Sequence, residues 1–250
     1  MSYAGDRIIN DADSHLMELP DFLTRHAESS IRDGIPGLYD SLVGQFDPQD
    51  HAEEIRHRPE NLEKLLALGD DLTKGPKWHD ALGSFNGQER STALDMLGFQ
   101  RQVVFSSFCA RLIFDAENDV IAYGAAAAHN RAMAAFCEGD RRLIGVAMVP
   151  LQDVERAVAE IEHAQSLGLG AIWIPADAPG GRSPGHPEND RIWAALAAAQ
   201  LPFILHVGSA ELMIDDEWMN DGRPDTDSAR GGAEVIGSKD LMTIHFATQR

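Results

Sequence analysis

The chain has 250 residues, a formal net charge of −19 and an apolar fraction of 44%, enough for one sizeable α/β domain over 1–250 with a real core. Such an acidic chain is ill suited to nucleic acid, which requires concentrated Lys and Arg, and no apolar run approaches the ~18 to 20 residues of a membrane helix. The N-terminus lacks a basic region followed by an apolar stretch, and the two cysteines, Cys109 and Cys137, are scattered. We therefore expect a cytoplasmic protein with free thiols.

The first predicted strand, residues 8–13, runs into an Asp-x-His pair formed by Asp13 and His15. In a strand, residues i and i+2 point to the same face, so these two side chains can bind one metal ion together. An Asp-x-His pair also arises often by chance. Its meaning therefore depends on a third ligand elsewhere.

The strand–helix pattern is interrupted between residues 16 and 99, where polar and Pro/Gly-bearing segments surround short helical candidates such as 59–68. We interpret this stretch as an insertion large enough to cover a site. Its histidines, His51, His57 and His79, lie among charged residues and are expected on the solvated surface. Glu18 either reaches the site or is a surface or hinge residue.

From residue 101 onward, strands and helices alternate. Strands are predicted at 102–108, 143–150, 171–175 and 203–207. Helices are predicted at 119–138, from the N-cap Asp153 to a stop at Gly168, and at 188–200. Apolar strands separated by helices are typical of a parallel sheet, and about five βα units indicate a β/α barrel or a doubly wound sheet.

His206 closes the last of these strands. A histidine there can be a satisfied core or capping residue. However, active sites of β/α barrels lie at the C-terminal ends of the strands, where Asp13, His15 and His206 would all stand. That shared position favours a metal site. Residues 209–238, rich in Gly and Asp, are expected to form a lid-like loop before a further helix.

Four blocks, residues 8–18, 130–137, 142–153 and 201–208, resemble the amidohydrolase-related (amidohydrolase 2) family of the amidohydrolase superfamily. The similarity is to the branch that contains aminocarboxymuconate-semialdehyde decarboxylase. The resemblance implies a TIM-type (β/α) barrel with a mononuclear metal site, in which Asp13, His15 and His206 occupy the positions of metal ligands. It also implies a proton-handling histidine after the sixth strand and an aspartate after the eighth.

Five strands are fewer than the eight of a closed barrel. We therefore expect an incomplete barrel, with the C-terminal strands and the remaining catalytic residues beyond Arg250. Its inner face would be exposed, and its open edge could pair in a homo-oligomer. His245 lies in a predicted helix opening and is not favoured as a catalytic group. His129 and Asn130 are expected to pack and cap a helix.

The resemblance predicts a metal-dependent decarboxylase (carboxy-lyase) or hydrolase that acts on a small carboxylate or carbonyl substrate. The cofactor would be one divalent metal, Zn or Mn, and the carboxylate of Asp13 shifts the balance modestly from zinc towards manganese. The alternative is a catalytically inactive fragment or binding module of the same fold. No motif identifies the substrate-binding residues.

Overall fold

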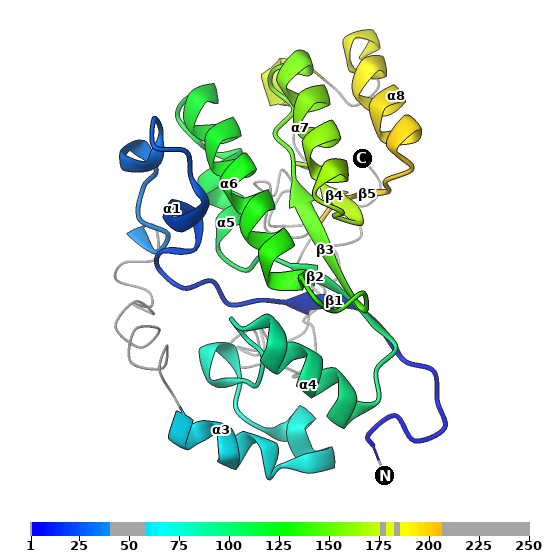
Figure 1. Ribbon diagram of the computed structural model, residues 1–250. Helices are drawn as coiled ribbons and strands as arrows, with labels where there is room; N and C mark the ends of the chain where they lie inside the picture. The colour runs from blue at the N-terminus through cyan, green and yellow to red at the C-terminus, as the bar shows by residue number, and fades with distance from the viewer. Residues whose placement is uncertain (1, 41–58, 176–178, 183–185, 207–250) are drawn as a thin grey trace, which may run out of the picture.

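The structure is a computed structural model, and it describes residues 2–40, 59–175, 179–182 and 186–206. Five strands form one sheet in the order in which they occur in the chain, and each pairs in parallel with the next (Figure 1). They are β1 (Asn10–His15), β2 (Arg101–Phe105), β3 (Leu143–Met148), β4 (Ala171–Trp173) and β5 (Phe203–Ile204). The sheet curls as an open half-barrel, which confirms the predicted incomplete α/β barrel.

The strands are connected by α5 (Cys109–Phe114), α6 (Asp119–Cys137), α7 (Val154–Ser166) and α8 (Asp190–Ala199). Figure 1 shows α6, α7 and α8 side by side along the sheet. The predicted helix boundaries are confirmed by local chemistry. The Asp153 side chain accepts a hydrogen bond from the backbone N–H of Arg156, and Gly168 follows the helix with a positive φ of 77°. Short 3-10 helices, η5 (Pro179–Gly181) and η6 (Pro187–Asn189), precede α8.

Alternation along the strands divides the core into two apolar clusters on opposite faces of the sheet. Val104, Ala147 and Ile172 belong to the cluster that includes residues of α7 and α8, on the outer face. Phe105, Met148 and Trp173 belong to the cluster on the inner face, with residues of α5 and of the segment 23–39. Successive strand residues thus belong to alternate faces of the sheet, as expected when both faces of a curled sheet are packed.

The inner face is buried at β2, β3 and β4, contrary to the expectation from an open sheet, whereas Asp13 on β1 is exposed. Phe105, Met148 and Trp173 are at most 3% exposed. The cause is local: Leu23, Ile35, Leu38 and Tyr39, which follow β1 in the chain, pack in the same cluster as these strand residues. Removing this apolar surface from water stabilises the folded chain.

The segment 16–99 contributes several short helices. They are α1 (Phe22–His26), η1 (Arg32–Gly34), α3 (Pro59–Leu66), η3 (Gly69–Lys74), η4 (Trp78–Asp80) and α4 (Gly87–Leu97). The first helix packs on α6, whereas α3, η3 and α4 surround a small apolar cluster of their own. Helix α4 also inserts Leu94 into the outer core. Among the described residues, no helix is long and apolar enough to cross a membrane.

Candidate metal centre

Strand β1 presents Asp13 and His15 on the inner face of the sheet, as the i, i+2 spacing predicts. Ser14, between them, points to the opposite face, where it contacts Arg90. The pairing of β1 with β2 shifts register between Asp11 and Ser14, so an irregularity of the β-bulge type lies at Ala12 and Asp13. Bulges increase local twist and re-aim side chains, and they often lie next to active sites.

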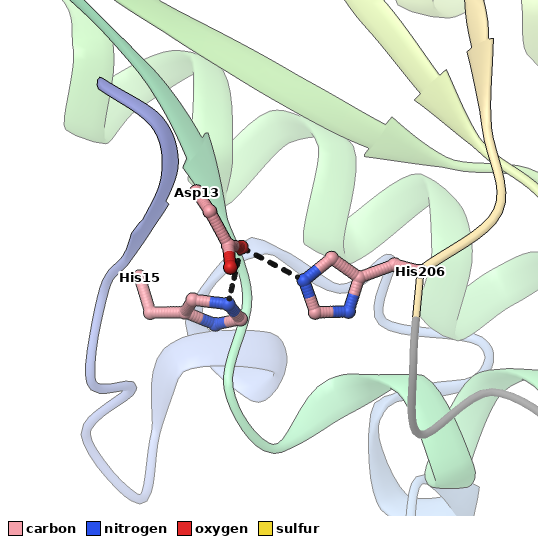
Figure 2. Close-up of side chains that lie close together, drawn as sticks. All are labelled: Asp13, His15 and His206. Carbon is pink, nitrogen blue, oxygen red and sulfur yellow. Dashed lines mark hydrogen bonds and ion pairs between the residues drawn. The ribbon is translucent and has the colours of Figure 1, made fainter. Parts of the chain in front are cut away.

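His206 follows β5 by two residues and reaches the same point from the other edge of the sheet. Its Nε2 lies 3.0 Å from Asp13 Oδ1, and His15 Nε2 lies 3.3 Å from the same oxygen (Figure 2). One ligand atom from each of the three residues falls within 4.8 Å of the others. The fold therefore brings together the three candidate ligands expected from the sequence, although Asp13 and His206 are 193 positions apart in the chain.

The orientation of the His15 ring explains why this cluster fits a cation. Nδ1 lies 3.0 Å from the carbonyl oxygen of Ser106. A carbonyl oxygen can only accept, so Nδ1 carries the proton and, in the neutral ring, Nε2 carries a lone pair. That lone pair faces an Asp13 oxygen that also has only lone pairs. Either a second proton on the ring or a metal ion is needed between them.

The charges in the cluster favour the ionised carboxylate. Hydrogen bonding from His15 and then from His206 holds the pKa of Asp13 well below its usual range. The Asp13 side chain is 71% exposed, whereas those of His15 and His206 are 27% and 13% exposed. Two imidazoles and one carboxylate suit zinc, manganese or iron, and three protein ligands leave positions for water or substrate.

Aromatic rings line the buried side of the cluster. The centroid of the Phe105 ring lies 5.6 Å from that of His15 and 4.6 Å from that of His206. The Trp173 ring lies 4.7 Å from His206. These rings restrict water and hold the imidazoles in place. The sequence analysis did not single them out, because both lie in the middle of the predicted strands 102–108 and 171–175, whereas the observed β2 and β4 end at these two residues.

Glu18 is neither a surface residue nor a hinge, because its side chain is fully buried. Its carboxylate accepts hydrogen bonds from the backbone N–H groups of Ser107, Phe108 and Cys109, at 3.0, 3.0 and 3.3 Å, and from the Ser106 hydroxyl. These donors lie between β2 and α5. Glu18 thus joins the loop after β1 to the loop after β2, directly behind His15.

The expectation that His79 lies on the solvated surface is wrong. It is fully buried, with Nε2 3.1 Å from the Glu18 carbonyl oxygen and its ring stacked on Phe108. The single turn of η4 directs His79 inward while its neighbour Trp78 stays 49% exposed. Charged neighbours in the sequence could not reveal that inward turn. His51 and His57 lie outside the described residues.

His129 and Asn130 have the packing role expected of them. Both are fully buried in α6. The Asn130 side chain accepts from the backbone N–H of Met148 at 2.8 Å and donates to its carbonyl oxygen at 3.0 Å, which fixes α6 against the end of β3. It also donates to the Glu160 carboxylate at 2.6 Å. Neither residue is one of the three clustered ligands.

Two further predictions concern residues outside the described part of the chain. They are the lid-like loop at 209–238 and the disfavoured catalytic candidate His245. Both stay predictions. Cys109 and Cys137 are free, as expected, and burial raises the pKa of each thiol.

The fold is thus a curled parallel sheet, and at the C-terminal ends of its strands lies a His–His–Asp cluster that could hold a metal ion. A family model described as amidohydrolase matches residues 15–243, and the chain belongs to that family. The resemblance drawn from the sequence is thereby confirmed. His15 and His206 lie within the matched range, and Asp13 lies just before it.

The sequence and structure are also similar to those of solved proteins, one of which shares the fold. An amidohydrolase from Mycobacterium avium subsp. paratuberculosis aligns with a TM-score of 0.56 and 22% identity over 79% of this chain. A 5-carboxyvanillate decarboxylase from Novosphingobium aromaticivorans, with bound manganese, aligns with a TM-score of 0.48 and 21% identity over 84% of it. The chain spans only 58% and 54% of the lengths of these two proteins. No curated protein that was compared with the sequence matches it.

Proposed function

We propose that this chain carries the metal-binding site of an amidohydrolase-family enzyme that acts on a small carboxylate or carbonyl substrate. One divalent ion, manganese or zinc, would be held by Asp13, His15 and His206. The observation that carries the proposal is the convergence of these three ligand atoms within 4.8 Å. In the neutral His15 ring, the lone pair of Nε2 would face the lone pairs of Asp13 Oδ1, and a cation between these two atoms would satisfy both.

Decarboxylation is the first candidate reaction, since the sequence blocks resemble the decarboxylase-containing branch of the family. A bound divalent ion would polarise a substrate oxygen and acidify a bound water. The two histidines would be held as neutral ligands, His15 by its bond to Ser106 O. Phe105 and Trp173 would exclude water from the buried side, which strengthens electrostatic interactions with a bound carboxylate.

Hydrolysis is the second candidate, and the exposure of Asp13 favours it. A side chain that is 71% exposed leaves the cluster open to water on one side. An inactive module that only binds metal is the third reading. Three assays of the same preparation separate these candidates. Release of CO2 from aromatic or unsaturated carboxylic acids would support the decarboxylase, and hydrolysis of amides or esters would support the hydrolase. Metal binding with neither activity would support the inactive module.

The metal site is tested by Asp13→Asn, which keeps the shape of the side chain and removes its charge. The metal-free 250-residue chain is titrated with Mn2+, Zn2+ or Fe2+, and bound metal is measured by elemental analysis. We expect one equivalent for the wild type and none for Asp13→Asn, His15→Gln or His206→Gln.

Asp11→Asn is the matched control, because Asp11 lies on the same strand but outside the cluster. Its carboxylate accepts from the Gln102 side chain and from the backbone N–H of Asp13, and asparagine keeps an oxygen that can accept from that N–H. This variant should still bind one equivalent. Full stoichiometry in all three ligand variants would exclude the assigned site.

A further inference from the structure

The buried Glu18 side chain is linked by hydrogen bonds to the candidate metal centre. The side chain is fully buried, and its partners are the Ser106 hydroxyl and three consecutive backbone N–H groups. Ionised carboxylates form strong bonds with such donors. This arrangement holds the loop from Ser106 to Cys109 against the loop after β1.

One of those donors belongs to the peptide group that orients His15. The N–H of Ser107 lies 3.0 and 3.1 Å from the two Glu18 carboxylate oxygens. The carbonyl oxygen of Ser106, at the other end of the same peptide group, accepts from His15 Nδ1 at 3.0 Å. Carboxylate, peptide group and imidazole therefore form a continuous chain of hydrogen bonds that ends at the metal-facing Nε2.

We propose that Glu18 is a positioning residue of the metal centre, which acts on His15 through the peptide group between Ser106 and Ser107. Hydrogen bonds in series polarise one another, so the carboxylate makes the Ser106 oxygen a stronger acceptor. A stronger acceptor on Nδ1–H fixes the ring and makes Nε2 a better metal ligand. Histidine ligands commonly gain this support from a carboxylate in direct contact. Here a peptide group lies between the two.

A purely structural role of Glu18 would give a different experimental result. The same loop is also held by the Ser107 hydroxyl, which donates to the Leu16 carbonyl oxygen at 2.8 Å. If Glu18 only stabilised the loop, its removal would lower the free energy of unfolding and leave the metal affinity of the folded chain unchanged. The proposed relay, which is the chain of hydrogen bonds from Glu18 through the Ser106–Ser107 peptide group to His15, requires the metal affinity itself to change. This inference rests on the proposed metal site.

The test compares Glu18→Gln, Glu18→Asp and the control Glu160→Gln by titrating each metal-free 250-residue chain with Mn2+ and with Zn2+. Glu160 is also buried (8% exposed), and its carboxylate contacts Asn130 and His163 instead of the cluster. We expect Glu18→Gln to raise the metal Kd by about 10- to 100-fold. Glu18→Asp keeps the charge and should recover part of that loss. Glu160→Gln should lower the melting temperature and leave Kd unchanged.

Each outcome has a distinct meaning. A wild type that binds no metal contradicts the proposed function and this inference with it. Two results would contradict the relay alone, provided that the wild type binds metal. In the first, folded Glu18→Gln has the same metal Kd as the wild type. In the second, Glu160→Gln raises the metal Kd as much as Glu18→Gln does.

If Glu18→Gln does not fold, a zinc titration of the wild type followed by amide NMR replaces it. Zinc on Nε2 makes Nδ1–H more acidic, which should move the Ser107 amide proton downfield more than those of Phe108 and Cys109. These two amides also donate to Glu18 but lie outside the relay. Equal or absent shifts would overturn the proposal.

Discussion

At the scale of single residues, Arg90 shows what the segment between β1 and β2 does for the site. It comes from α4 and is 7% exposed. Its guanidinium donates to the carbonyl oxygens of His15 and Gly83, at 2.8 and 2.7 Å, and to the Ser14 hydroxyl. Burial lowers its pKa to about 10, which still leaves it charged at neutral pH. Arg90 thus supports β1 from the outer face, while the candidate ligands Asp13 and His15 point to the inner face.

Arg90→Met should lower the free energy of unfolding by about 3 kcal/mol, because buried carbonyl oxygens lose a charged donor while the apolar volume is kept. Urea unfolding measures the change. Arg131→Met is the control, since the Arg131 guanidinium makes one such bond, to the His26 carbonyl oxygen at 2.9 Å. Its loss should be closer to 1 kcal/mol. Equal losses would show that Arg90 has no special bracing role.

At the scale of elements, two asparagines support α6 in different ways, one at its N-cap and one within the helix. Asn118 caps the helix, since its side chain accepts from the backbone N–H of Ile121 at 3.0 Å. Asn130, three turns further on, binds both backbone groups of Met148. The first bond is exposed and local, whereas the second set is buried and joins helix to strand.

We expect Asn118→Ala to lower the free energy of unfolding by about 1 kcal/mol, the usual cost of a lost N-cap. Asn130→Ala should cost more, about 3 kcal/mol, because the Met148 N–H and carbonyl groups stay buried without this partner. Chemical denaturation of the two variants in parallel provides the comparison. A cost for Asn130→Ala no larger than that of Asn118→Ala would contradict it.

The strand–helix alternation was predictable from the sequence because apolar runs and cap residues such as Asp153 are local signals. Asp13, His15 and His206 were predictable for a related reason: all three stand at strand ends of one parallel series. Glu18, His79 and Arg90 were not, because each of them is held by a partner at least 61 residues away in the chain. Burial of a charged side chain is decided by such distant partners, which no local pattern records.

At the scale of the whole molecule, a metal ion would join the first and last described strands. Anything that binds only the folded state stabilises it. Metal at 100 times its Kd should raise the free energy of unfolding by about 2.7 kcal/mol. Thermal melts with and without chelator measure this, and Asp13→Asn should melt at the same temperature in both. The gain should disappear as acidic pH protonates the histidine ligands.

The nearness of His206 to Asp13 has a geometric meaning for the sheet. Strands β1 and β5 are its opposite edges. In a flat sheet with spacings of about 4.8 Å, they would stand roughly 19 Å apart. Their side chains instead approach to 3.0 Å. The distance between these two candidate ligands therefore depends on the curvature of the whole sheet. A spin label or a metal spectrum at this point would detect any flattening of the sheet, including flattening at strands that lie well away from it.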